Sequence, residues 1–126
     1  MRVLIGMVLV AIIIIGAGIF GQRYLLTTRQ SLYDALAEVE AVLLQDDWEL
    51  SEAKACELEE YWRNTQHKWA LLISQTETER VGLAIVRLVS RIKNKEKGEA
   101  LMEIATGRSL LDSTINKELL SLLNLL

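Results

Sequence analysis

The sequence of 126 residues contains no proline, one cysteine and one histidine. Because proline interrupts helices and marks turns, its absence is compatible with long, unbroken helices. One cysteine excludes a disulfide within the chain. One histidine leaves few ligands for the usual zinc sites and too few partners for a hydrolytic triad. We therefore expect an all-α protein, with no cofactor and no metal site.

The net charge and the sequence motifs exclude further classes of protein. The formal net charge of −3 is too small to predict nucleic acid as a partner, and no phosphate-binding loop or nucleophile elbow occurs. Glu57, Glu59 and Glu60 could coordinate a cation, but a solvated helix face accounts for them better. We expect His67 at the surface and Cys56 as a small buried side chain. No catalytic residue is predicted, and the chain is not expected to be an enzyme.

One long apolar run lies near the N-terminus. Val3 to Phe20 comprises 18 residues without a charged or strongly polar side chain. As a helix it would span roughly 27 Å, close to the ~30 Å hydrocarbon core of a bilayer. Gly16 and Gly18 have the spacing of a signal-peptidase site, so a cleaved signal peptide is the alternative. Because the apolar run continues through Phe20, we expect a retained transmembrane signal anchor over residues 1–22.

The charges on the two sides of the apolar run nearly balance. Arg2 and the α-amine precede it, and Arg23 and Arg29 follow it, so the positive-inside rule gives little direction. A short N-terminal flank usually stays inside the cell. We therefore predict a single-pass protein of the cell membrane whose helical domain, residues 23–126, lies outside the cytoplasm.

Four amphipathic stretches follow, separated by polar interruptions at residues 45–47, 74–79 and 94–98. Their apolar residues recur at steps of three, four and seven, which is typical of helices with one buried face. Short connections make successive helices antiparallel. The prediction is an antiparallel bundle of about four helices, arranged as two hairpins. The capping boxes predicted at the interruptions are Asp46 with Glu49, Ser74 with Glu77, and Thr76 with Glu79.

Three features of this bundle stay open. Thr27 or Thr28 could cap the first bundle helix, or that helix could continue the membrane helix outward. Gly107 could kink or split the last helix. The first interruption, at Asp46-Asp47, precedes the similar one at Lys95-Glu96 by about fifty residues, which hints at a duplicated hairpin.

Charge is distributed unevenly between the two hairpins. Residues 30–80 carry twelve acidic and four basic side chains, whereas residues 81–126 carry five acidic and seven basic ones. We expect a modest, salt-screened attraction between the first hairpin and the second.

A tryptophan stripe is the most distinctive feature. Trp48, Ala55, Trp62 and Trp69 are seven residues apart, and this spacing returns to nearly the same side of a helix. The indoles could fill a core, each finding a partner for its N–H, or they could bind a ligand. We favour the core; exposed Trp62 and Trp69 lining a cleft would favour the ligand. The predicted structural core comprises Trp48, Ala55, Trp62, Trp69, Ile85 and Leu88.

The C-terminal stretch, residues 119–126, has leucine at six of its eight positions. It is more apolar than one helix face requires. We expect it to pack on the first hairpin, over Leu36, Val39 and Leu43 or the tryptophans; contact with a partner or with the bilayer is the alternative.

A series of residues follows the apolar helix in a recognisable order: Asp47-Trp48, Ala53 or Ala55, Trp62, Trp69, Arg87-Leu88 and, near the leucine-rich end, Asn124. This order resembles a family of uncharacterised short proteins from spore-forming Gram-positive bacteria, a domain of unknown function. Its members often carry a histidine in the middle turn, where this chain has residues 74–79 without one, so no role of that histidine carries over. The resemblance implies no activity.

The biochemical task stays unknown from the sequence. The favoured interpretation is a non-enzymatic helical interaction module, tethered to the membrane through residues 3–20 and acting at the cell envelope on an unidentified protein partner. The alternative is a ligand-binding or sensory domain that uses the stripe of Trp48, Trp62 and Trp69. The oligomeric state is open.

Overall fold

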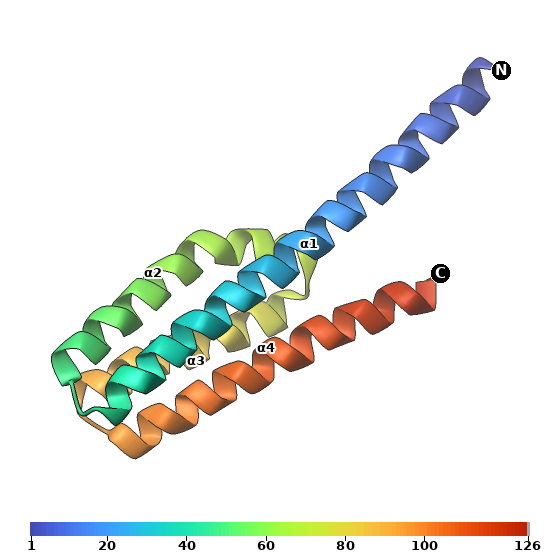
Figure 1. Cartoon of the computed structure of the whole chain (residues 1–126). Coiled ribbons are helices and arrows are strands. Elements are labelled where there is room, and N and C mark those ends of the chain that lie inside the picture. The colour runs from blue at the N-terminus through green and yellow to red at the C-terminus, as the bar shows by residue number, and fades with distance from the viewer. Residues whose placement is uncertain (126) are drawn as a thin grey trace.

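The computed structural model describes the backbone of residues 1–125 and the side chains of residues 1–113. The described residues form no strand. Successive helices are antiparallel, and α1 also packs against α4, so that the helices close into a ring (Figure 1). The prediction of an all-α antiparallel bundle is confirmed. The helices are α1 (Arg2–Leu44), α2 (Trp48–Leu72), α3 (Gln75–Lys93) and α4 (Lys97–Leu125).

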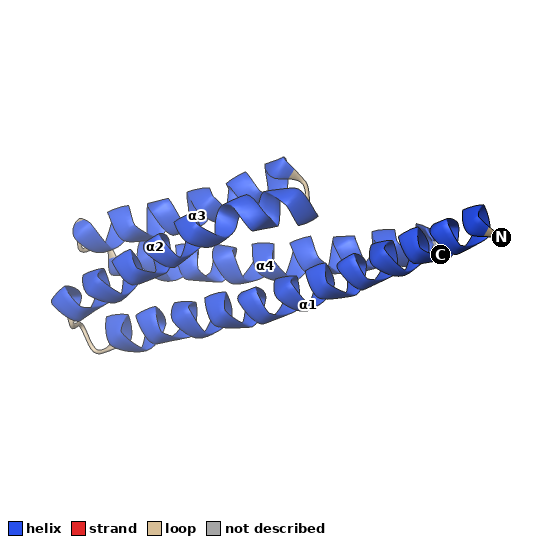
Figure 2. Cartoon of the chain, turned by 90° about the horizontal axis from the view of Figure 1, so that it is seen from above, coloured by secondary structure: helices blue, strands red, loops and turns tan. Residues whose placement is uncertain are grey.

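Helix α1 is one continuous helix with two different halves. Its first half projects from the bundle in both views (Figures 1 and 2), and residues 1–20 are all exposed. This half is long and apolar enough to cross a membrane. From Gly21 onward one stripe is buried, at steps of three and four residues typical of a helix packed on one side. The buried residues of α1 are Gly21, Leu25, Thr28, Leu32, Leu36, Val39 and Leu43.

Of the two alternatives for the first bundle helix, the second is therefore correct, because this helix continues the N-terminal apolar helix. No helix begins at Thr27 or Thr28. The Thr28 hydroxyl instead donates to the Tyr24 carbonyl oxygen at 2.8 Å, within the same helix.

The turns α1–α2 and α3–α4 lie together at the end of the bundle opposite the projecting half of α1, here called the distal end (Figure 1). Asp46 and Lys95 each have a left-handed backbone, with φ of 60° and 57°. After them the Asp47 N–H donates to the Val42 carbonyl, as the Glu96 N–H does to that of Arg91. The same turn thus occurs twice, about fifty residues apart, in line with the hypothesis of a duplicated hairpin.

The predicted N-cap at Asp46 is wrong. The cap of α2 is Asp47, whose carboxylate accepts from the Leu50 N–H at 3.1 Å. Asp46 lies in the turn that follows α1 and has a left-handed backbone, a conformation that aspartate tolerates better than most residues. Its carboxylate is 2.9 Å from Lys97 Nζ and so joins the two distal turns.

The start of α3 agrees with one of its two predicted boxes. The Ser74 hydroxyl accepts from the Glu77 N–H at 3.2 Å and caps α3. Thr76 lies inside the helix and is not an N-cap. Gly107 neither kinks nor splits α4. It is buried, and a Cβ there would lie 3.4 Å from Leu36 Cδ1. The glycine therefore serves the close packing of α4 on α1.

Ion pairs between the hairpins follow the charge distribution in part. Arg108 of α4 is 2.8 Å from Glu40 of α1, which pairs a base of the second hairpin with an acid of the first, as Lys97 and Asp46 do. A third pair, Arg29 with Asp112 at 3.7 Å, has the opposite polarity.

The backbone of α4 continues past the α2–α3 turn, toward the level of the projecting half of α1 (Figures 1 and 2). The side chains of its end lie outside the described residues, and the predicted packing of residues 119–126 lies there too. In the described part of α4, Gly107 and Leu111 face Leu32 and Leu36 of α1.

Candidate functional site

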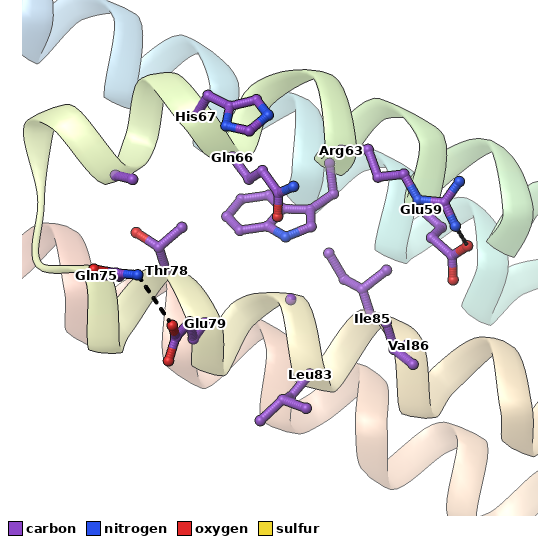
Figure 3. A pocket seen from close by; sticks show the side chains of 13 residues that line it. Glu59, Arg63, Gln66, His67, Gln75, Thr78, Glu79, Leu83, Ile85 and Val86 are labelled. Atoms are coloured by element: carbon purple, nitrogen blue, oxygen red, sulfur yellow. Dashed lines mark hydrogen bonds and ion pairs between the residues drawn. The ribbon is translucent and has the colours of Figure 1, made fainter.

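A groove of about 590 Å³ runs between α2 and α3. Trp62 and Gly82 contribute to its lining, and polar side chains from both helices face one another across it (Figure 3). The groove combines an apolar surface with polar groups, which is the usual composition of a binding site. The labelled side chains from α2 include Arg63, Gln66 and His67, and those from α3 include Gln75, Glu79 and Leu83.

The tryptophan stripe lies mostly in the core. Trp69 is fully buried and Trp62 is 3% exposed, and their rings meet edge to face with centroids 5.3 Å apart. Trp69 Nε1–H donates to the Thr28 hydroxyl oxygen at 2.8 Å. The stripe does not form a cleft of exposed indoles. Among the other predicted core residues, Ala55, Ile85 and Leu88 are buried and Trp48 is partly buried.

Trp62 differs from Trp69 in its N–H group. Its Nε1 is buried and has no hydrogen-bond partner. A Cβ added at Gly82 of α3 would lie 2.9 Å from this nitrogen, so the glycine makes room for the indole. An unsatisfied buried donor costs about 1–3 kcal/mol. The expectation that each indole finds a partner for its N–H therefore fails at Trp62, on the wall of the groove.

The rim of the groove carries both signs of charge, and its groups are engaged locally. Arg63 is 2.7 Å from Glu59 of the same helix. Gln75 donates to Glu79 at 3.4 Å (Figure 3). His67 is exposed, as predicted. A ligand in the groove would meet an exposed imidazole and side chains whose present partners lie one helical turn away.

The prediction that Cys56 is buried is wrong, because its side chain is exposed. It follows the fully buried Ala55 by one position, and adjacent helix positions point in different directions. Glu57 approaches Lys54 at 3.9 Å. Among the described residues no group of three histidine, cysteine, aspartate or glutamate side chains could hold a metal ion.

A polar seam between α1 and α4 is a feature that the sequence did not reveal. The Tyr33 hydroxyl donates to the Arg108 carbonyl oxygen at 3.1 Å, and Arg29 lies over the Tyr33 ring at 5.6 Å. Burial, and next the neighbouring carboxylate of Asp112, raise the pKa of Tyr33 to about 12. The partners are more than seventy residues apart in the chain. Helical periodicity carries no information on such a pairing.

Comparison with known proteins places the chain in a family. The model of a domain of unknown function, DUF4363, matches residues 19–125. No curated protein and no solved structure matches the chain. The match covers the whole bundle and begins inside the apolar run, and it confirms the resemblance to an uncharacterised domain family. The chain therefore belongs to the DUF4363 family, a domain of unknown function.

Proposed function

We propose that this protein is a membrane-tethered helical module that works by contact with another protein and not by catalysis. The observation that carries the proposal is the continuity of α1, which runs without a break from an exposed apolar half into the packed bundle. A helix has no flexible linker at the point where it leaves the lipid. The bundle would therefore be held at a fixed height above the membrane.

The apolar half has the composition that such a tether requires. Twelve residues of the run from Val3 to Phe20 are valine, leucine, isoleucine or phenylalanine. Each favours insertion by about 0.3–0.6 kcal/mol near the middle of the membrane, so insertion as a whole gains several kcal/mol. An exposed apolar surface of this size is rare on proteins that stay in water.

The ion pairs of the bundle support a role in contact with another protein over a role in catalysis. Arg63, Lys54 and Arg108 are each within ion-pair distance of a carboxylate of the bundle. These pairs fix helix faces and helix neighbours. The proposal includes the side and the setting: the bundle lies outside the cytoplasm, at the envelope of a spore-forming bacterium.

Insertion of charge into the apolar half tests the tether while the chain keeps its full length. Aspartate near the middle of a membrane helix costs about 2.5–3.5 kcal/mol, so the double variant Ile12→Asp, Ile13→Asp should cancel the gain from the run. The variant should leave the membrane fraction upon alkaline carbonate extraction, whereas the parent should stay. Met102→Asp, at an exposed position of α4, is the matched control and should stay as well. Release of the parent chain by carbonate would contradict the tether.

A second candidate function is the binding of a small ligand in the α2–α3 groove. The observation in its favour is the buried Trp62 N–H without a partner, on the wall of that groove. A ligand that presents a carboxylate or carbonyl oxygen would supply the missing acceptor.

Indole N–H resonances of the isotope-labelled full chain in detergent test this second function, with acetate as the probe. Trp69, whose N–H is already bonded to Thr28, is the internal reference. A saturable shift at Trp62 and none at Trp69 would support ligand binding. Equal, non-saturable shifts at both indoles would remove the support.

A further inference from the structure

The turns at the two ends of the bundle differ in polarity. The end at which α1 leaves the bundle, here called the anchor-side end, carries the α2–α3 turn (Figure 1). Residues 69–76, which form this turn and its flanks, contain no charged side chain. The distal end, in contrast, carries charged residues in both of its turns, at 46–47 and at 93–97. The uncharged turn is thus the one at the end that faces the proposed membrane.

Two leucines at the end of α2 lie beside the point where α1 emerges. A Cβ built on Gly21 would be 2.9 Å from Leu72 Cδ2, so the turn touches α1 one residue after the apolar run ends at Phe20. Leu72 is 37% exposed and Leu71 is 86% exposed. An exposed leucine is ordinary by itself. These leucines, however, lie next to an apolar helix of membrane-spanning length, so lipid is the environment that would surround them.

A basic and aromatic pair lies about one helical turn away from these leucines, on the side of the bundle. Lys68 Nζ is 5.4 Å from the centre of the Tyr24 ring, and Arg23 beside it is exposed. Tyrosine, lysine and arginine are the side chains that settle at the headgroup level, with their apolar parts toward the lipid. The order from the end of the bundle is thus apolar first and amphipathic second, as at a membrane interface.

We propose that the α2–α3 turn is a second membrane contact, in which Leu71 and Leu72 enter the acyl boundary of the bilayer. This inference rests on the proposed tether, since α1 brings the turn to the lipid. Its consequence is orientation. A bundle that touches the bilayer at the turn as well as through α1 stands with its distal end away from the membrane and does not swing about a single helix.

Fluorophores on single cysteines in the full chain test this contact, in vesicles of phosphatidylethanolamine and phosphatidylglycerol. The exposed native cysteine is first removed by Cys56→Ser. The dye is then placed at Leu71→Cys, at Ile12→Cys in the tether, or at Met102→Cys, an apolar position of α4 near the distal end that is 69% exposed. Quenching by aqueous iodide is compared with quenching by a lipid that carries a nitroxide on its acyl chain.

We expect the dye at position 71 to be quenched several-fold less by iodide than the dye at position 102, and to be quenched by the nitroxide lipid. Equal iodide quenching at 71 and 102, with the dye at position 12 shielded, would overturn the second contact and leave the tether standing. Iodide access at position 12 would overturn both proposals. Because Leu71 is exposed, its replacement leaves the packing of the bundle unchanged.

Discussion

Gly82→Ala is a substitution for which two physical effects oppose each other. Gly82 lies in the middle of α3, where alanine is favoured over glycine by about 1 kcal/mol of helix propensity. The new methyl group, however, would lie 2.9 Å from Nε1 of the buried Trp62 ring and 3.8 Å from its Cδ1. A real Cβ does not approach a ring nitrogen so closely, so the indole or the helix must shift.

The structure indicates which effect is larger. The Trp62 ring is held by its edge-to-face contact with Trp69, which is fully buried and bonded to Thr28, so a shift disturbs the packing among three helices. Overpacking of this kind costs about 1–3 kcal/mol. After subtraction of the propensity gain, we expect Gly82→Ala to lower the free energy of unfolding by about 1 kcal/mol. For a domain of this size that corresponds to a lower melting temperature by roughly 4–8 °C.

The assay is thermal unfolding of the full chain in detergent, followed by circular dichroism. Gly98→Ala is the matched control: Gly98 lies in the first turn of α4, and a Cβ there meets nothing within 4 Å. This control should raise the melting temperature slightly or leave it unchanged. If Gly82→Ala stabilises the protein as much as Gly98→Ala does, the ring of Trp62 does not lie against Gly82, and the described α2–α3 packing is wrong.

Four further predictions concern Trp62, Tyr33, the side of the membrane on which the bundle lies, and the N-terminus. Trp62→Ala should cost about 3–5 kcal/mol, because it empties a core position; a variant that melts like the parent would show that Trp62 fills no core. The pKa of an unfolded tyrosine is about 10, and burial raises the pKa of Tyr33 to about 12. The contribution of Tyr33 to stability is therefore complete below pH 10 and is lost as the pH rises from about 10 to about 12. Tyr33→Phe should show a smaller loss of stability over this range in denaturant unfolding, and an equal loss would refute the assignment. Protease added to intact protoplasts should degrade the bundle, and full protection would reverse the expected orientation. Mass spectrometry of the mature chain should find the N-terminus before Val3, and a new N-terminus near Ile19 would show that the segment is cleaved.

The parts of the fold that depend on local pattern could be predicted from the sequence. The α3 stripe of Val81, Ile85, Leu88 and Ile92 is buried as its spacing indicates, and the Ser74 cap is where a capping box was expected. Asp46 and Asp47 show the limit of such patterns. Either aspartate could cap the helix by its chemistry, and the left-handed backbone of Asp46 that decides between them is a property of the turn as a whole.

Features that depend on pairing between helices could not be predicted. The missing partner of the Trp62 N–H follows from Gly82 on the facing helix. The seam of Tyr33 and Arg108 joins helices at opposite ends of the chain. Cys56 is exposed although Ala55, one position earlier, is buried. The spacing of apolar residues does not locate the edge of a buried helix face to within one residue. The α2–α3 groove could not be predicted either, because a groove exists only once both of the helices that form its walls have been placed side by side.

The continuity of α1 is the central claim, and the distance between spin labels on its two halves tests it most directly. Ile12 in the projecting half and Ala37 in the bundle half are both exposed, and labels can be attached there as cysteines in the Cys56→Ser background. The distance is measured by pulsed electron paramagnetic resonance in phospholipid vesicles. A continuous helix rises about 1.5 Å per residue and should therefore give one narrow distance distribution at about 38 Å. A broad or much shorter distribution would show a hinge between lipid and bundle, and would contradict a module held at a fixed height above the membrane.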